Sequence, residues 1–266
     1  MVKRLTETLP TGYRVVLVEK NSHFNYLFVF PRFSVARGYE KYAFIPYSGL
    51  FKKAPTGIFE QLRGRVIDVD EQAVWLEDGE SLAYEYLVVA TGTSSGFPSK
   101  MASTNSVEAE EELRGIQDRV ADANRIAVIG GGAVGVELAS DIKDFFPEKN
   151  VTLFHSRPQL LPSFGRRLHD VVMARFQELG ITVLLEERPV LQEGKKTLKL
   201  GDGSDMELDL IVSESFRENS PEETFIGLDS MHRATPKLID HIHSITFIHI
   251  ETNIAHPRKA DPSIIR

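Results

Sequence analysis

The middle of the chain holds a glycine-rich segment with the spacing of a dinucleotide-binding loop. The pattern G-x-G-x-x-G is satisfied by Gly130-Gly131-Gly132-Ala133-Val134-Gly135. In this pattern the first glycine permits a tight turn, the second lets the backbone approach a pyrophosphate, and the third lets a helix and a strand pack closely. We expect the pyrophosphate to sit on free amides at the positive end of the following helix. The alternative interpretation is a glycine-rich turn that binds no ligand.

The next predicted strand, at 150–155, does not end in the acid that would hold an adenosine ribose. It ends in His155-Ser156-Arg157, and Glu148 lies before the strand rather than after it. An acid at this end would repel a 2′-phosphate, whereas Arg157 could pair with one. The sequence therefore favours NADPH, or the use of both nicotinamide cofactors, with His155 and Arg157 beside the ribose. The alternative is that Arg157 is a solvated loop residue.

Two fragments in the first half of the chain are typical of a second dinucleotide site. Glu19 ends a predicted strand at 13–18, where its carboxylate could accept ribose hydroxyls. Ala90-Thr91-Gly92 ends a later strand, where small residues let a loop approach a cofactor. Neither fragment alone is strong evidence for a cofactor site, because a helix-to-strand turn followed by Glu is common.

The elements predicted around the glycine-rich loop form a βαβαβ series. Its strands and helices alternate over 125–129, 132–146, 150–155, 166–179 and 181–185. A helix at 107–123 precedes the series, and a meander at 190–208 and a buried strand at 208–212 follow it. This order is half of a doubly wound nucleotide-binding fold, so the predicted class is α/β.

The first half of the chain is predicted to be less regular. A helix at 2–9 and the strand at 13–18 come first, and 58–90 is predicted to be a β-meander with strands at 66–69, 73–76, 81–82 and 86–90. Between them, residues 21–57 are rich in Phe and Tyr. We interpret these aromatic side chains as core packing for irregular segments, or alternatively as a wall for a planar cofactor.

Composition excludes several classes of protein. The chain has 266 residues, a formal net charge of −7 and no cysteine, which excludes disulfide frameworks, cysteine-based metal sites and a redox dithiol. The acidic balance argues against nucleic-acid binding. No apolar run is long enough for a transmembrane helix, the start lacks a secretory signal, and Val2 stands where myristoylation needs glycine. We expect a cytoplasmic protein, with association to mitochondrial or other lipid surfaces left open.

The last part of the chain, residues 213–266, differs in character from the rest. It contains five of the eight histidines: His232, His241, His243, His249 and His256. No metal-ligand spacing such as H-E-x-x-H is present, so no metal site is expected. Residues 242–250 alternate partly between histidine and apolar residues and could form a strand.

In combination, these motifs resemble the two-dinucleotide flavoproteins, in which an NAD(P)H domain interrupts an FAD domain. The narrower resemblance is to the apoptosis-inducing-factor-like branch of the pyridine nucleotide-disulphide oxidoreductases, which includes ferroptosis-suppressor NAD(P)H–quinone reductases. It covers about residues 1–212 and rests on three further segments: Lys41-Tyr42-Ala43-Phe44-Ile45-Pro46-Tyr47, Phe97-Pro98-Ser99-Lys100 and Phe146-Pro147-Glu148-Lys149-Asn150-Val151-Thr152-Leu153-Phe154-His155-Ser156.

This resemblance implies FAD as the redox centre, with hydride passing from NAD(P)H to the flavin and electrons then to a quinone or another small acceptor. By position, it implies that Glu19 holds the FAD ribose and that Arg32, Ala90, Thr91 and Gly92 lie along this cofactor. It likewise implies Glu137 beside the nicotinamide and Lys100 near the flavin, where a lysine stabilises negative charge or transfers a proton. For Lys100, the alternative is a solvated loop lysine. This branch works without a dithiol, which agrees with the absence of cysteine.

The sequence departs from this family pattern at two places. No glycine-rich loop precedes the helix at 2–9, and no second Gly-Asp loop follows Val212. We therefore predict a partial FAD-binding domain with a β-meander at 1–104, an NAD(P)H-binding domain at 105–212 and an atypical, disordered tail at 213–266. Our hypothesis is a truncated chain with an unrelated tail. The alternative function is a nucleotide-binding fragment without flavin or activity, and the oligomeric state is left open.

Overall fold

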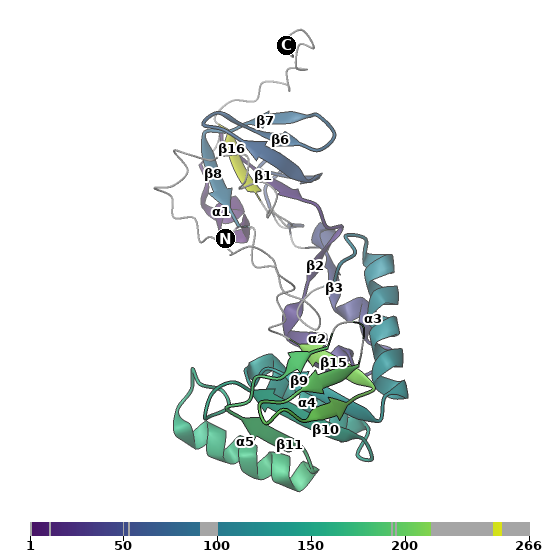
Figure 1. Cartoon of the computed structure of the whole chain (residues 1–266). Coiled ribbons are helices and arrows are strands. Elements are labelled where there is room, and N and C mark those ends of the chain that lie inside the picture. Colours follow the sequence, from purple (N-terminus) through teal and green to yellow (C-terminus); the bar gives the residue numbers. More distant parts are fainter. Residues whose placement is uncertain are drawn as a thin grey trace. The chain divides into compact units, whose positions relative to one another are not determined.

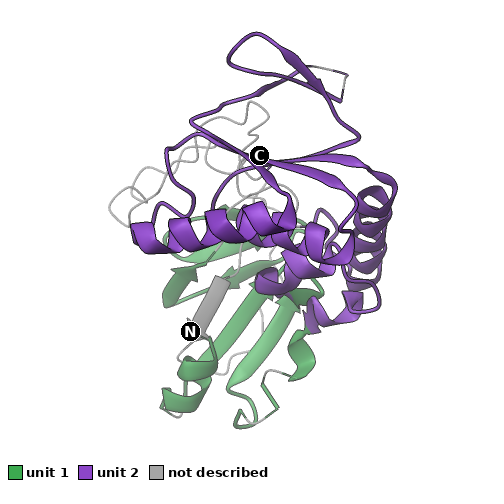
Figure 2. Cartoon of the chain, turned by 90° about the horizontal axis from the view of Figure 1, so that it is seen from below, with its two compact units in different colours: residues 1–24, 46–94, 219–266 green, residues 25–45, 95–218 purple. Residues whose placement is uncertain are grey.

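The structure is a computed structural model that describes residues 2–10, 12–49, 51–52, 54–90, 101–192, 194 and 196–213, together with the backbone of 247–251. The chain forms two compact units (Figure 2). Unit 1 comprises residues 1–24, 46–94 and 219–266, and unit 2 comprises residues 25–45 and 95–218. Among the described residues, no helix combines the length and the apolarity needed to cross a bilayer.

Unit 2 is built on a parallel four-stranded sheet with the strand order β11-β10-β9-β15 (Figure 1). Its elements are β9 (Arg125–Ile129), α4 (Ala133–Phe145), β10 (Asn150–His155), α5 (Arg166–Leu179), β11 (Thr182–Leu185) and β15 (Leu210–Ser213). The inner strand β9 is a continuous apolar run in which Ile126, Ala127 and Val128 are fully buried, as expected of a parallel strand covered on both faces. The predicted α/β class with a Rossmann-like sheet is confirmed.

Local sequence signals account for the ends of the helices in unit 2. The helix α3 (Ser106–Asp122) begins after Asn105, whose side chain accepts a hydrogen bond from the Val107 amide at 2.9 Å. The helix α5 ends at Gly180, which has a φ of +70°. A glycine adopts this left-handed conformation without strain, and it closes the last turn through its amide. The sequence predicts the beginning of α3 and the end of α5 to within one residue.

Residues 25–45 fold against α3. The apolar positions Ala109, Leu113, Ile116 and Val120 of α3 are buried, and three of them share a core cluster with Phe30, Ala43 and Phe44. The elements of this part of the chain are β2 (His23–Asn25), a 3-10 turn at Leu27–Val29, α2 (Phe30–Phe33), a 3-10 turn at Glu40–Tyr42 and β3 (Phe44–Pro46). None of these short elements is predicted from the sequence, because their pairing depends on contacts with distant residues.

The aromatic residues of 21–57 divide between two roles. Phe30 and Phe44 are buried with their rings 5.7 Å apart, which agrees with the core-packing interpretation. Phe28 is 83% exposed, and Tyr39 and Tyr42 are also more than half exposed. The core-packing interpretation therefore holds for part of this set only.

The rest of unit 2 is a small antiparallel meander. It consists of β12 (Val190–Leu191), β13 (Thr197–Lys199) and β14 (Asp205–Glu207), in that spatial order. Leu198 is fully buried in a cluster with Ala127 and Phe154, so this meander covers one face of the parallel sheet. The meander predicted at 190–208 is confirmed.

Unit 1 is built on a mixed four-stranded sheet with the order β4-β1-β16-β8. Its strands are β1 (Arg14–Glu19), β4 (Phe59–Arg63), β8 (Tyr86–Val89) and β16 (Phe247–Glu251), and α1 (Val2–Thr8) packs on β1. β1 is parallel to β4, whereas β16 is antiparallel to both β1 and β8. β16, which overlaps the strand predicted within 242–250, thus lies in the middle of a sheet whose other strands are parallel to one another.

The predicted β-meander of 58–90 is only partly correct. Its three-stranded antiparallel core is β5 (Val66–Val69), β6 (Ala73–Leu76) and β7 (Ser81–Ala83). β4 and β8 belong instead to the sheet of β1 and β16. The sequence indicates the strand β8 but not β4, and periodicity does not show which partner a strand pairs with, which explains the difference.

We predict that a proline at Ile248 will open the sheet of unit 1. Ile248 pairs with Leu17 of β1 and with Val88 of β8, and proline cannot donate a ladder hydrogen bond in a central strand. In Ile248→Pro, amide hydrogen exchange at Leu17 and Val88 should accelerate by tenfold or more, since a lost buried hydrogen bond costs roughly 1–3 kcal/mol. Unchanged protection in this variant would show that β16 is dispensable.

The matched control for this experiment is Glu251→Pro. Glu251 is the last residue of β16 and pairs with Arg14 of β1 alone. Proline is tolerated better at strand ends, so exchange at Val88 should stay close to that of the wild type.

Candidate functional site

The glycine-rich loop connects the end of β9 to the beginning of α4. Gly130 has a φ of +129°, a conformation that side-chain-bearing residues rarely adopt, and its amide donates to the Phe154 carbonyl at 2.9 Å. Gly132 is the N-cap residue of α4, and no side chain caps this helix. The first-turn amides of α4 have no partner within the helix, so the loop presents donors suited to an anion.

Two positions of this loop have no space for a side chain. A Cβ at Gly135 would lie 2.0 Å from the Gly130 carbonyl oxygen. A Cβ at Gly131 would lie 2.6 Å from both His155 Cγ and Leu160 Cδ2. Glycine at 135 therefore lets α4 begin directly against the turn, and glycine at 131 lets the segment after β10 close over the loop.

His155 joins the end of β10 to the loop. Its Nδ1 accepts a hydrogen bond from the Gly131 amide at 3.1 Å, which assigns the ring proton to Nε2. The Nε2 atom is buried and has no hydrogen-bond partner among the described residues. Burial and the nearby Arg157 charge hold the pKa of His155 below its ordinary value, so the ring is neutral at pH 7. His155 is thus a fixed neutral donor beside the loop.

The segment after β11 is bonded to the end of β10 beside Arg157. Arg157 is exposed, but Glu186 donates its backbone amide to the Arg157 carbonyl at 3.3 Å, and Glu187 donates its own to the His155 carbonyl at 3.1 Å. The Glu187 carboxylate accepts a hydrogen bond from the Gly201 amide. Sequence reasoning missed these two acids, because they follow β11 and reach the end of β10 only through parallel pairing of the two strands.

Glu137 lies in the second turn of α4 and shares a helix with two further acids. Arg32 of α2 pairs with Asp141 through its Nη1 and lies 3.7 Å from Asp144 Oδ2. The guanidinium also stacks over the Phe145 ring at 4.9 Å. Burial, followed by the charge of Asp141, raises the pKa of Glu137, and Arg32 opposes this shift. Arg32 is therefore engaged with the side chains of α4.

Glu19 lies at the end of β1 in unit 1, where the sequence places it. Its side chain is buried, and its Oε1 accepts hydrogen bonds from the amide and side-chain nitrogens of Asn21 at 3.0 and 2.9 Å. The Tyr47 hydroxyl donates to Oε2 at 3.2 Å. Burial and the Glu19 charge raise the pKa of Tyr47, which keeps the hydroxyl protonated as this donor. Ala90 follows β8 and is exposed, whereas Thr91, Gly92 and Lys100 lie outside the described residues.

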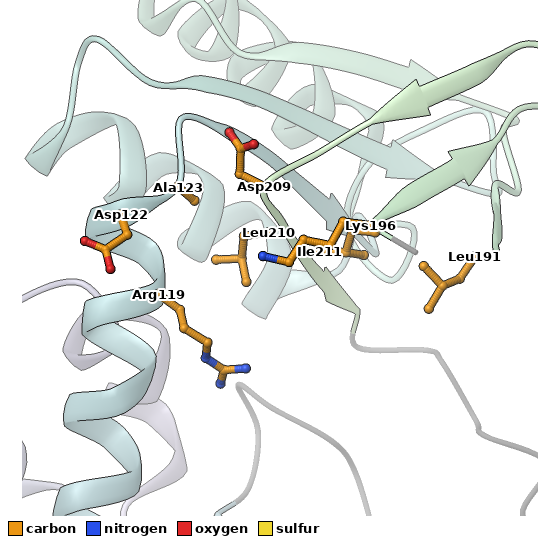
Figure 3. A pocket seen from close by; sticks show the side chains of 8 residues that line it. All are labelled: Arg119, Asp122, Ala123, Leu191, Lys196, Asp209, Leu210 and Ile211. Atoms are coloured by element: carbon orange, nitrogen blue, oxygen red, sulfur yellow. The ribbon is translucent and has the colours of Figure 1, made fainter. Parts of the chain in front are cut away.

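An open cleft of about 440 Å³ lies beside the beginning of β15 (Figure 3). It is lined by the end of α3, by the β12–β13 hairpin and by the beginning of β15: Arg119, Asp122, Ala123, Leu191, Lys196, Asp209, Leu210 and Ile211. Hydrogen bonds from the Arg125 side chain and from the Arg125 and Asn124 amides hold the pKa of Asp209 at about 2. Asp209 thus ties β15 to the beginning of β9, and this cleft is separate from the glycine-rich loop.

We predict that Gly135→Ala will destabilise unit 2. The added Cβ meets a backbone oxygen at 2.0 Å, so helix and loop must separate, at a cost of about 1–3 kcal/mol or more. Chemical unfolding of the full chain measures this loss. A variant as stable as the wild type would show that α4 moves freely against the loop.

The control for this substitution is Gly115→Ala in the exposed middle of α3. A Cβ there has no neighbour within 4 Å. Because alanine is favoured over glycine in a helix, this variant should be more stable by about 0.5–1 kcal/mol.

Comparison with known proteins gives concordant results. The family model for pyridine nucleotide-disulphide oxidoreductases matches residues 1–225. Fe-regulated protein 8 of Mycosarcoma maydis is 35% identical over 255 residues, covering 87% of this chain and 64% of that protein. Human ferroptosis suppressor protein 1 is 35% identical over 181 residues, covering 65% of this chain and 46% of that protein. The chain therefore spans about half to two thirds of the length of these relatives.

Among solved structures, the ferredoxin reductase for the CYP199A2 system from Rhodopseudomonas palustris has a TM-score of 0.57 at 16% identity. The match covers 79% of this chain and 54% of that chain. At this identity the likeness concerns the fold alone, and it agrees with the Rossmann-like sheet of unit 2. The match to the family model covers most of the sequence, and the chain belongs to the pyridine nucleotide-disulphide oxidoreductase family.

Proposed function

We propose that the chain acts as an FAD-dependent NAD(P)H oxidoreductase that passes electrons from NAD(P)H through the flavin to a quinone or a similar small acceptor. The observation that carries this proposal is the loop of Gly130 to Gly135, whose backbone is packed so closely that Gly131 and Gly135 admit no side chain. Membership of an oxidoreductase family and similarity to a ferroptosis suppressor protein support the redox chemistry. We place the protein in the cytoplasm, with peripheral contact to lipid surfaces where apolar quinones reside.

The residues of unit 2 fit NAD(P)H. The uncapped beginning of α4 offers amides for the pyrophosphate, and Gly132 stands where the backbone must approach it. In our proposal His155 and Arg157 lie beside the adenosine ribose, and Glu137 lies on the nicotinamide side. The buried, unpartnered Nε2 of His155 is a donor that a bound ligand could satisfy after a small movement.

The fit of FAD rests on fewer described residues. FAD supplies, when bound, the two-electron centre between nicotinamide and quinone. Glu19 is the acid at the end of β1 that would hold its ribose, and its carboxylate accepts hydrogen bonds from Asn21 and Tyr47. In our proposal Ala90, Thr91 and Gly92 lie along FAD, and Lys100 stabilises charge or transfers a proton.

A second candidate function is nucleotide binding without flavin. The observation that favours it is the position of β16, which is antiparallel in the middle of the sheet of unit 1. Dinucleotide loops follow parallel strands that lead into a helix, whereas β16 is antiparallel to both of its neighbours. The two candidates differ in what unit 1 binds, and unit 2 binds NAD(P)H in both.

Purified protein distinguishes the two candidates. We expect visible flavin absorbance in the full chain, bleaching of this absorbance by NADPH, and continued NADPH oxidation after a soluble quinone is added. The bleaching and the NADPH oxidation should be absent in a matched Gly132→Asp variant, whose carboxylate repels the pyrophosphate of NADPH. A colourless protein that binds NADPH and consumes none would remove the enzyme proposal and leave the second candidate.

For cofactor choice, we predict that Arg157→Glu weakens NADPH binding about tenfold more than NADH binding. Loss of a charge-assisted pair with the 2′-phosphate, and the new repulsion, account for a difference of this order. Fluorescence titration with each nucleotide measures it. Arg175→Glu on the exposed face of α5 is the control of equal charge change, and it should leave the ratio of the two affinities unaltered. Equal losses in Arg157→Glu would remove the 2′-phosphate argument.

A further inference from the structure

The segment that joins β10 to α5, residues 156–165, is bonded to the glycine-rich loop at a single residue. We name this segment the β10–α5 connection. The Gly131 amide donates to His155 Nδ1 at 3.1 Å, and the Gly131 carbonyl accepts the Leu161 amide at 2.8 Å. Gly131 is buried, and a Cβ there would meet both His155 and Leu160. Both backbone groups of Gly131 are therefore used to hold the connection against the loop.

A second histidine holds the same connection from α5. His169 is 5% exposed, and its Nδ1 accepts the Leu160 amide at 3.0 Å. Leu160 is thus bonded to α5, and the next residue, Leu161, is bonded to the glycine-rich loop. Leu161 has a φ of +51°, a left-handed conformation that a leucine adopts at a cost and keeps where surrounding contacts impose it. The connection is therefore held in a strained form by bonds on two sides.

Both imidazoles must be neutral to make these bonds. A ring nitrogen that accepts a hydrogen bond carries no proton, whereas an imidazolium has a proton on each nitrogen and accepts no hydrogen bond. Protonation of His155 would therefore set a ring N–H against the Gly131 N–H, and protonation of His169 would do the same at the Leu160 N–H. A buried amide that loses its acceptor is costly, so either protonation favours opening of the connection.

We propose that His155 and His169 are positioning residues that keep the β10–α5 connection closed on the glycine-rich loop while both rings are neutral, and that acid opens the connection and weakens the binding of a nicotinamide nucleotide. The nucleotide part of this inference rests on the proposed function. Gly131 lies within the G-x-G-x-x-G segment, so its displacement moves the loop whose amides would hold the pyrophosphate. The connection also carries Arg157, which we propose to lie beside the ribose.

The groups around His155 favour its neutral form. Burial and then the Arg157 charge lower its pKa, and the nearby Gln159 carbonyl opposes this shift. Because the open form takes up the proton more readily, opening should begin as pH falls below about 6.5, the ordinary value for histidine. From the segment after β11, Glu186 and Glu187 bond to the end of β10 through their backbone amides, and the Glu187 carboxylate accepts the Gly201 amide.

The charged side chains on the other packed elements are engaged with one another or exposed. Those engaged are Arg125 with Asp209, Arg32 with Asp141 and Asp144, Arg166 with Asp170, Arg175 with Glu178, and Lys143 with the Pro147 and Lys149 carbonyls. Those exposed are Glu137, Arg167 and Arg188. Among the described residues, Arg157 is the charged group that shifts the pKa of His155.

The first test needs no nucleotide. In the full chain labelled with ¹⁵N, the shifts of the imidazole nitrogens report which nitrogen of His155 and of His169 carries the proton, and both neutral rings should carry it on Nε2. Hydrogen-exchange protection of the Gly131 and Leu160 amides is then measured relative to the intrinsic rate at each pH. Between about pH 7.5 and 5.5 it should fall about tenfold or more, since each pH unit below the ordinary histidine pKa favours opening by up to about tenfold per ring.

Matched substitutions separate the titration from the loss of a side chain. In His169→Asn an amide oxygen stands near the place of Nδ1 and accepts without titrating, whereas His169→Gln places its amide near the place of Nε2. The Leu160 amide should keep its protection in acid in His169→Asn, and should lose it at both pH values in His169→Gln. The substitutions His155→Asn and His155→Gln should give the same contrast at the Gly131 amide.

The control is His23→Asn. His23 is a buried histidine of unit 1 whose Nδ1 lies 3.1 Å from Ser22 Oγ, and this variant should keep the wild-type fall in protection. Where a Gln variant does not fold, the Asn variant decides the question, since it keeps the acceptor and removes the titration. A neutral ring with its proton on Nδ1, ring protonation without loss of protection, or an undiminished loss in the Asn variants would overturn the inference.

The second test links the connection to nucleotide binding in the full chain, with NAD⁺ as the probe. NAD⁺ is stable in acid and lacks the 2′-phosphate, a group that titrates near neutral pH. Its Kd should rise about three- to tenfold between about pH 7.5 and 5.5, because only the closed form binds. The rise should be smaller in His169→Asn and smallest when His155→Asn is combined with it, whereas His23→Asn should show the full rise.

The outcomes of the second test separate the inference from the proposed function. An imidazolium that attracts the pyrophosphate directly would give tighter binding in acid, and that result would overturn the inference. Reduced protection with a level NAD⁺ affinity would remove the link between the connection and nucleotide binding. If NAD⁺ binds at neither pH, the proposed function fails, while the NMR and exchange results still decide whether the two histidines hold the connection.

Discussion

The close packing of Gly135 against the Gly130 carbonyl oxygen is the constraint on which unit 2 depends. A Cβ would need to lie 2.0 Å from that oxygen, so α4 begins where it does because Gly135 has none. The loop is then closed from the other side by His155 and Leu160, which contact Gly131. Once α4 is fixed against β9, its later residues have fixed positions too, and the acids of α4 meet Arg32 of α2.

Buried cations complete the fixing of these helices. Lys149 is 3% exposed, and its Nζ donates to the carbonyl oxygens of Ala121 and Ala123 at 2.6 and 2.5 Å, which are the last carbonyls around the end of α3. Lys143 does the same for the segment that follows α4. A positive charge at the C-terminal end of a helix is favourable, and these carbonyls would otherwise lack partners. Lys149 thus caps the end of α3, Lys143 fixes the segment after α4, and both side chains are engaged by protein carbonyls.

The sequence predicts unit 2 much better than unit 1, and the reason is the range of the interactions. The βαβαβ series has its signals in the chain itself: an apolar run in β9, glycines at 130–135, and Gly180 after α5. By contrast, β4 pairs with β1 across about forty residues, and β16 reaches the same sheet from the far end of the chain. The partners of Arg32, and the backbone bonds of Glu186 and Glu187 to the end of β10, likewise depend on packing that no local pattern encodes.

The two units therefore bear differently on function. Each strand of the parallel sheet in unit 2 lies within about ninety residues of every other, and the loop that would hold NAD(P)H depends on contacts inside this unit. The sheet of unit 1 instead requires a strand from residues 247–251 in its middle, between β1 and β8. Because a central strand bonds on both sides, whatever occupies that position determines the spacing of β1 and β8, and with it the surroundings of Glu19. Whether the protein is a flavin enzyme or binds nucleotide without flavin therefore depends on unit 1, and within unit 1 on the central strand β16.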